Sequence, residues 1–107
     1  MATSLPVACI FRSKRTTHSE DEYQVWSYEM DQLVREMPGY LRHLSFRDPS
    51  TREGVTISYF DDSAAIERWH EHPRHVQAQE LGRQIFYDEY TIEVVEVLRQ
   101  YGWTRPD

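Results

Sequence analysis

Cysteine is almost absent from this sequence, and so are long apolar runs and any surplus of positive charge. The single cysteine, Cys9, cannot form a disulfide within the chain, and it lies in an apolar run where a buried thiol behaves as a small hydrophobic side chain. No stretch reaches the roughly 18 apolar residues of a membrane-spanning helix, and the N-terminus has no basic segment followed by a separate apolar core. We therefore expect a cytoplasmic protein that has no membrane partner.

The charge balance excludes a further class of partner. The chain has 18 acidic and 12 basic side chains, a formal net charge of −6. These charges are spread without blocks, so no basic patch is expected to bind the phosphates of a nucleic acid or the surface of an anionic membrane. Aromatic residues make up 13% of the chain, which suits either a pocket for a flat small molecule or an ordinary core.

Four short runs of apolar and β-branched residues predict strands. They cover residues 5–12, 40–47, 55–60 and 91–98. Residues 48–54 join the second run to the third and contain the Pro, Ser and Gly that are typical of a turn. We therefore expect the second and third strands to form a hairpin, and residues 14–18 to form a polar turn after the first strand.

Two helical regions are expected between these strands. The first begins at residues 19–22, which match the Ser-x-x-Glu capping box, and ends at Pro38 and Gly39. Its apolar residues recur at spacings of three and four, so one face should pack on a sheet. The second region follows the possible caps Asp61 and Asp62, runs from residue 64 to about 72, is interrupted by Pro73, and resumes to about residue 87.

The order β, α, β, β, α, β predicts one α+β domain over residues 1–107, a ferredoxin-like βαββαβ fold with a four-stranded antiparallel sheet and helices on one face. The first and last strands nevertheless carry apolar side chains on both faces, for example Cys9 against Ile10 and Val94 against Val95. Because soluble monomers rarely expose such a patch, we expect a homodimer through the sheet faces. The core is expected at residues 5–98, and the aromatic tail at 99–107 should pack on the partner subunit.

A set of residues along the chain carries a resemblance to a known family. They are Pro38-Gly39-Tyr40, Val55, Ile57 to Ser63, Ala65, Ile66, Trp69, His72, His75, Ala78, Gln79, Gly82, Arg83, Phe86, Tyr87 and Tyr90. In these positions the chain resembles the antibiotic biosynthesis monooxygenase superfamily of dimeric α-β barrels, from about residue 5 to residue 103. Members oxidise aromatic polyketides or quinols without a cofactor, or degrade haem, so the resemblance implies a fold more narrowly than a reaction.

Two residues are the leading candidates for the site. The resemblance places Trp69 facing a cavity between sheet and helices, where the indole would be a flat wall for an aromatic ligand; the alternative is a core tryptophan. His75 is in register with Ala78, Gly82 and Phe86, so its side chain should point inward. With an ordinary pKa of about 6.5, this imidazole could act as the catalytic base toward a phenol or enol; the alternative is a buried histidine bonded to the backbone.

Other residues are expected to line the same pocket. They are Tyr59, Phe60, His72, Arg83 and Tyr87. Arg83 could hold an anionic oxygen, although an arginine on a helix is more often solvated or ion-paired. His43 could line the pocket or face a dimer partner, and the sequence leaves both open.

No metal site is expected from the histidines. His70 and His72 are two residues apart and would point about 200° away from each other on a helix. Pro73 breaks the helical register before His75, so the three imidazoles do not converge.

No cofactor is expected either. The haem-degrading relatives are characterised by an asparagine, a tryptophan and an axial histidine, whereas this chain has no asparagine and has Gln79 or Glu80 where the axial ligand would fall. The polyketide-oxidising relatives also use an asparagine beside the tryptophan, where this chain has Ala64 and Ala65. What remains is a generic reaction, in which a pocket desolvates an electron-rich aromatic compound, a base removes its proton, and the carbanion reduces O₂.

Three functions therefore compete. The first is a cofactor-independent monooxygenase acting on a small aromatic or quinol-like compound. The second is a non-catalytic dimer that binds a small ligand or has a stress-related role, and the third is a purely structural oligomer. An open cavity containing Trp69 and His75 would favour the first two, and a filled one would favour the third.

Overall fold

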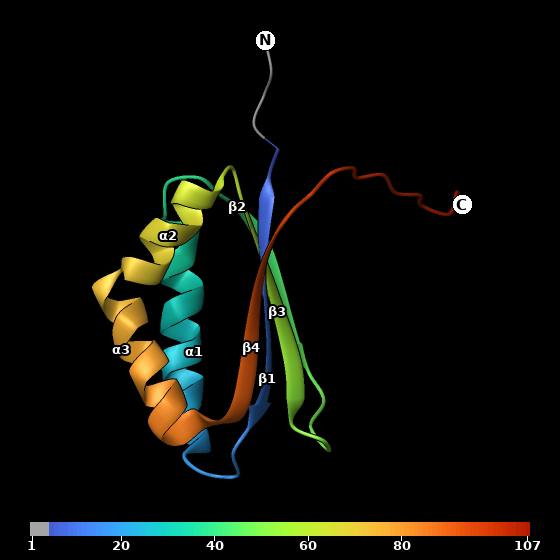
Figure 1. The fold of residues 1–107 in the computed structure, drawn as a ribbon. Helices are drawn as coiled ribbons and strands as arrows, with labels where there is room; N and C mark the ends of the chain where they lie inside the picture. Colours follow the sequence, from blue (N-terminus) through green and yellow to red (C-terminus); the bar gives the residue numbers. More distant parts are fainter. Residues whose placement is uncertain (1–4) are drawn as a thin grey trace.

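The computed structural model describes residues 5–107. The strands are β1 (Val7–Arg15), β2 (Tyr40–Arg47), β3 (Glu53–Phe60) and β4 (Tyr87–Glu96); the helices are α1 (Glu20–Arg35), α2 (Ser63–Glu71), α3 (Pro73–Leu81) and the π-helix η1 (Gly82–Phe86). The strands form one antiparallel sheet in the order β2-β3-β1-β4, and Figure 1 shows the helices on one face of it. The predicted ferredoxin-like α+β fold is confirmed.

The ends of β1 and β4 differ from the prediction. β1 continues to Arg15 because Ser13 and Lys14, although polar, pair with Gly54 and Glu53 of β3. The polar turn predicted for residues 14–18 therefore begins later than expected, after Arg15. β4 begins at Tyr87, where η1 ends, and not at residue 91, and it stops at Glu96.

The start of α1 also differs from the prediction. Ser19 has a φ of 57° and a ψ of 41°, in the left-handed region, and its side chain makes no capping hydrogen bond. A capping hydroxyl requires an extended backbone at this position, so the predicted capping box is wrong. The first turn is instead tied by Glu20, which accepts hydrogen bonds from Arg15 and Gln24.

The break between α2 and α3 is as predicted. His72, the residue before Pro73, has a ψ of 128°, because the proline ring disfavours helical backbone at the residue that precedes it. The His72 Nδ1 accepts a hydrogen bond from the Arg74 backbone N–H at 3.2 Å and so caps α3. Asp62 caps α2 in the same way, accepting from the Ala65 N–H at 3.0 Å.

The hydrophobic core lies between the sheet and the helices α1 and α2. Its buried members are Val7, Val34, Phe60, Ala65, Ile66 and Trp69. Gly39, which follows α1, has a φ of +86°, and a Cβ atom there would lie 2.7 Å from the Cβ of Ala65. Glycine at this position therefore lets α2 approach the chain after α1 closely.

The other face of the sheet, here called the outer sheet face, is not covered by any helix of residues 5–107. Strand register places on it Ala8, Ile10, Leu44, Phe46, Val55, Ile57, Tyr59 and Val95. Phe46 is 68% exposed, and Leu44 and Val95 are each 39% exposed. The apolar second face predicted from the sequence is therefore present.

The tail after β4 extends away from the rest of the chain (Figure 1). Its Leu98, Tyr101 and Trp103 are exposed. Within residues 5–107, the structure contains no helix that is both long and apolar enough to cross a membrane.

Candidate active site

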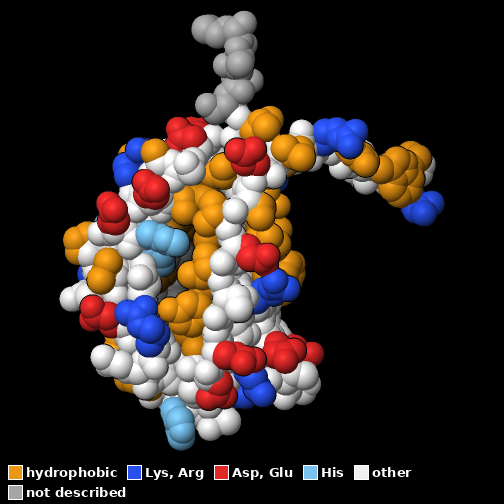
Figure 2. All heavy atoms as spheres, in the orientation of Figure 1, with side chains coloured by type: hydrophobic (Ala, Val, Ile, Leu, Met, Phe, Trp, Pro, Cys, Tyr) orange, Lys and Arg blue, Asp and Glu red, His pale blue; other side chains and the backbone are white. Residues whose placement is uncertain are grey.

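A cavity of about 330 Å³ lies between the sheet and the helices. Its floor consists of side chains that alternate along the strands, such as Cys9 and Phe11 of β1 and Thr56 and Ser58 of β3. Helices α1, α2 and α3 and the π-helix η1 provide the other walls. Figure 2 shows the molecule hollowed between the helices and the edge strand β4, with hydrophobic side chains inside the hollow.

Trp69 and His75 form a stacked pair in the cavity wall. Their ring centroids are 4.1 Å apart and their planes differ by 12°. The helical backbone breaks at His72, before Pro73, and the first turn of α3 then places the His75 imidazole on the Trp69 indole. One face of the indole is therefore covered by His75, and the flat wall expected from Trp69 alone is shared by the two rings.

The hydrogen bonding of His75 defines its tautomer. Its Nδ1 lies 2.9 Å from the Trp69 carbonyl oxygen, which can only accept a hydrogen bond, so Nδ1 carries the proton. In the neutral ring Nε2 then keeps its lone pair. His75 thus combines the two alternatives left open by the sequence: it is bonded to the backbone, and it lines the cavity.

Burial lowers the pKa of His75 from 6.5 to about 4, because the charged imidazolium loses its hydration. Repulsion from His70 and His72 acts in the same direction, while the hydrogen bond to the Trp69 carbonyl opposes it. This differs from the ordinary pKa expected from the sequence. At neutral pH, His75 is an uncharged hydrogen-bond acceptor.

A hydrogen-bonded chain connects α1 with β2 at another part of the cavity wall. The His43 Nε2 lies 2.5 Å from Asp31 Oδ1, and the His43 Nδ1 lies 2.6 Å from the Tyr40 hydroxyl. Asp31 also accepts hydrogen bonds from Gln32 and Arg35 through Oδ2. Asp31 and His43 line the cavity, so this chain fixes a carboxylate in the wall.

The π-helix η1 places Tyr87 in the cavity wall. A Cβ atom at Gly82 would lie 3.0 Å from two ring carbons of Tyr87, so the absence of a side chain gives the phenol its space. Desolvation raises the pKa of Tyr87, and the neighbouring Tyr23 adds to the effect. Tyr87 is therefore a neutral phenol at physiological pH.

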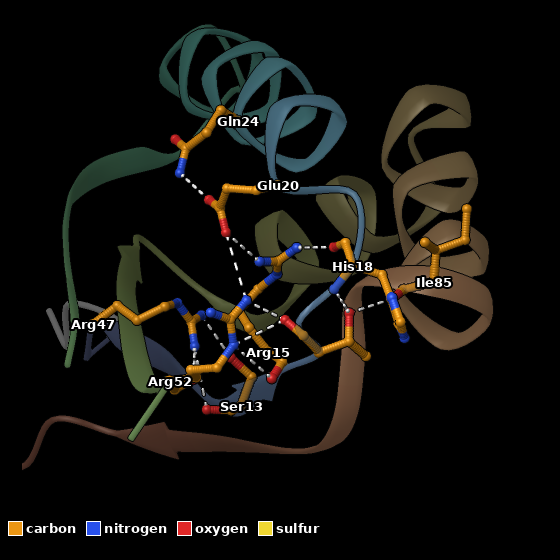
Figure 3. Close-up of polar contacts among 9 residues, drawn as sticks. Ser13, Arg15, His18, Glu20, Gln24, Arg47, Arg52 and Ile85 are labelled. Atoms are coloured by element: carbon orange, nitrogen blue, oxygen red, sulfur yellow. Dashed lines mark hydrogen bonds and ion pairs between the residues drawn. The ribbon is translucent and has the colours of Figure 1, made fainter. Parts of the chain in front are cut away.

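Arginines gather near the start of α1, beside the cavity-lining residue Tyr23, and Figure 3 shows their polar contacts. Arg15 is 1% exposed; it donates to Glu20 at 3.0 Å and to the His18 carbonyl at 3.1 Å, and its guanidinium lies 3.8 Å from the centroid of the Tyr23 ring. The charge of Arg15 is thus compensated by a carboxylate and an aromatic face.

The loop after β1 fastens η1 to this same end of the sheet. The Thr16 hydroxyl donates to the Ile85 carbonyl at 2.7 Å, and the Thr16 N–H donates to the Phe86 carbonyl at 2.9 Å. Arg52 donates in turn to the Thr16 carbonyl, and Arg47 donates to the Arg52 carbonyl (Figure 3). These bonds hold the π-helix that presents Phe86 and Tyr87 to the cavity.

Comparison with known proteins agrees with this architecture. The family described as "Antibiotic biosynthesis monooxygenase" matches residues 7–81. The chain belongs to this family. A relative named "Uncharacterized protein YqjZ" from Bacillus subtilis (strain 168) is 36% identical over 93 residues, which cover 87% of this chain and 80% of the relative.

Solved structures show the same fold at low identity. Rv0793 from Mycobacterium tuberculosis superposes with a TM-score of 0.78 at 14% identity, covering 91% of this chain and 99% of that one. SnoaB, a cofactor-independent oxygenase from Streptomyces nogalater, superposes with a TM-score of 0.75 at 15% identity, covering 90% and 96% of the two chains.

In this member of the antibiotic biosynthesis monooxygenase family, the residues singled out by the sequence fall into two groups. Trp69, His75 and Tyr87 line the cavity, whereas His72, Arg83, Tyr59 and Phe60 do not. His72 caps α3 through its imidazole, and Arg83 is exposed on η1, with Nη1 3.3 Å from the Tyr90 hydroxyl.

Tyr59 and Phe60 of β3 lie outside the cavity for different reasons. Tyr59 lies on the outer sheet face, with the guanidinium of Arg42 3.9 Å from its ring centroid. Phe60 points to the helix side but is fully buried in the core. The even-numbered residues of β3 that reach the cavity are Thr56 and Ser58.

Sequence reasoning missed Asp31 and left His43 undecided. The alternation of side chains along β2 could have indicated the face on which His43 lies. In the structure His43 pairs with Ser58, and both lie on the cavity face. Asp31 carried no signal, since a carboxylate on an amphipathic helix is expected to face solvent. Within residues 5–107, no group of three or more His, Cys, Asp or Glu side chains is arranged to hold a metal ion.

Proposed function

We propose that this protein is a cofactor-independent monooxygenase that oxidises a small aromatic or quinol-like compound in the cavity between sheet and helices. The observation that carries the proposal is the Trp69–His75 stack in the wall of an aromatic-lined cavity of about 330 Å³, where the bond from Nδ1 to the Trp69 carbonyl leaves Nε2 unprotonated. Membership of the monooxygenase family and the fold of SnoaB support the reaction class.

In the proposed reaction, a hydroxyl of the substrate donates a hydrogen bond to His75 Nε2. An imidazole with a pKa of about 4 is a weak base toward a resting phenol. A phenol becomes a much stronger acid when its ring loses an electron, so we expect the proton to move to Nε2 as an electron moves to O₂. For a quinol, one oxygen atom of O₂ enters the ring, the other leaves as water, and the product is a hydroxyquinone; no added reductant is required.

The apolar walls have a second role in this reaction. They remove water from the substrate, which strengthens its hydrogen bond to His75 and protects reduced oxygen species from stray protons. The stack with Trp69 and the hydrogen bond to its carbonyl hold the imidazole in one orientation. The entropy of ordering this side chain is therefore lost on folding and not when the substrate binds.

Oxygen uptake tests the role of His75. With hydroquinone as substrate, His75→Gln should lower kcat by roughly 100-fold, the scale of general base catalysis, and change ligand affinity little. The wild-type rate should not decline because of His75 between about pH 8 and pH 5, and should fall as the pH approaches about 4, because a protonated imidazole cannot accept.

The matched control is His18→Gln, which alters an exposed histidine outside the cavity and should keep the full rate. Unchanged oxygen uptake in His75→Gln would show that His75 is not the base. The low basicity of His75 also favours a second candidate, a non-catalytic ligand-binding dimer, and binding without oxygen uptake in the wild type would select it.

We also propose that the protein is a homodimer. Its two subunits would pair through their outer sheet faces, and the tail after residue 98 would pack on the partner subunit. One support is the apolar outer sheet face, on which Phe46, Leu44 and Val95 are exposed. The other is the tail, which extends away from the rest of the chain and exposes Tyr101 and Trp103. Residues 5–98 form the core of its single domain, and its cytoplasmic location remains a prediction.

A further inference from the structure

We infer that Asp31, held by His43 and Tyr40, is a specificity-determining residue, which makes the cavity select neutral hydroxyl-bearing aromatic compounds and reject aromatic anions. The inference rests on the proposed function in that both use the same cavity. It adds residues from α1 and β2 and concerns the charge of the ligand, which the Trp69–His75 stack does not decide.

The first support is the charge of the cavity wall. Among the described residues that line the cavity, Asp31 is the one carboxylate, and none is a lysine or an arginine. His75 is neutral at physiological pH, and so is Tyr87. Among the lining residues, the negative charge of Asp31 is therefore not balanced by the positive charge of a lysine or an arginine.

The second support is the ionisation of Asp31 itself. Burial acts to raise its pKa, but hydrogen bonds from Arg35 and His43 outweigh this effect and hold the pKa below its ordinary value. Asp31 is therefore a carboxylate across the physiological range, and a carboxylate accepts hydrogen bonds but donates none.

The third support is the orientation of that carboxylate. Since Asp31 can only accept, His43 Nε2 carries a proton and donates a hydrogen bond to Asp31 Oδ1, and His43 Nδ1 lies 2.6 Å from the Tyr40 hydroxyl. The His43 side chain is only 9% exposed, and Tyr40 packs against the core. The three side chains are therefore joined by hydrogen bonds that hold the Asp31 carboxylate in one orientation in the cavity wall.

The arginines near the cavity do not reverse this charge preference. Arg35 is bound to Asp31 and is itself exposed, and Arg15 lies behind Tyr23 with its charge matched by Glu20. Arg83 is exposed on η1 and is not among the lining residues, although its Nη1 lies 3.3 Å from the hydroxyl of Tyr90, which does line the cavity. An anionic ligand would thus meet Asp31 without a lining lysine or arginine to receive it, and like charges placed close together repel.

The test compares 2-naphthol with 2-naphthoate, which share a ring system and differ in charge. At about pH 7 the wild type should bind 2-naphthol at least roughly tenfold more tightly than 2-naphthoate. Asp31→Asn should weaken 2-naphthol and strengthen 2-naphthoate, so that this ratio falls by roughly tenfold. Tyr40→Phe, which removes only the hydroxyl that braces His43, should lower the ratio by a smaller factor.

Glu36→Gln is the matched control, because it removes one negative charge from an exposed residue just after α1 and should leave the ratio unchanged. The ultraviolet absorbance of bound 2-naphthol gives a second readout. A carboxylate beside the ligand should shift the ionisation of 2-naphthol to higher pH, and Asp31→Asn should remove that shift, with Arg35 and His43 as the other charged or titratable groups that contact Asp31.

Each outcome separates this inference from the proposed function. Equal binding of the two probes by the wild type, or a ratio that Asp31→Asn does not change, would overturn the selection by Asp31 and leave the role of His75 standing. If neither probe binds the wild type, both the cavity as a ligand site and the selection by Asp31 are wrong.

Discussion

Trp69→Ala is expected to lower the free energy of unfolding by about 3–5 kcal/mol, the usual cost of truncating a buried tryptophan. The side chain is 8% exposed and belongs to the core cluster with Phe60, Ala65 and Ile66. The same substitution removes the ring on which His75 stacks, so a flat phenolic ligand should bind about 1 kcal/mol more weakly. Denaturant titration and ligand titration measure the two effects on one protein.

Two further variants separate stability from binding. Phe60→Leu truncates a fully buried ring outside the cavity and should lose stability while keeping ligand affinity. Trp69→Phe keeps an aromatic face beneath His75 and should retain most of the affinity. If Phe60→Leu weakened the ligand as much as Trp69→Ala does, Trp69 would be a core residue without a separate role in the site.

Val95→Asp is expected to dissociate the proposed homodimer into monomers and to make the protein unfold at a much lower denaturant concentration than the wild type. Val95 lies on the outer sheet face, where its pairing with Ala8 and the pairing of Ala8 with Tyr59 place all three side chains together. A buried, unpaired carboxylate in a dimer interface would be strongly unfavourable, and an interface that is part of the core unfolds when it separates.

Sedimentation of the wild type at micromolar concentration should give twice the monomer mass of 12.8 kDa. Val25→Asp is the control, because it makes the same chemical change at a residue of α1 that is 66% exposed. It should leave both the mass and the unfolding midpoint nearly unchanged. A monomeric wild type would remove the proposed interface through the outer sheet face.

Much of the fold could be predicted because its signals are local. The apolar stripe of α1, the Asp62 cap and the break at Pro73 each depend on a few neighbouring residues, and all three are present. The extension of β1 to Arg15 could not be predicted in this way. Its polar residues are strand because β3 offers them backbone partners, and that information lies elsewhere in the chain.

The candidate site was only partly accessible to sequence reasoning, for the same reason. His75 was placed correctly because helical spacing set its direction, whereas Tyr59 and Phe60 were given one face although strand neighbours point to opposite faces. Asp31 and His43 are twelve residues apart on different elements, and they meet only because α1 lies across β2. The low pKa of His75 likewise depends on burial, which spacing alone does not reveal.

A crystal structure of the wild-type protein with a bound dihydroxynaphthalene would test most directly whether the cavity between sheet and helices is the active site. We expect the aromatic ring to lie in the cavity beside the Trp69–His75 stack, with one hydroxyl at hydrogen-bonding distance from His75 Nε2. A ligand bound outside this cavity, or a cavity filled by side chains, would contradict it.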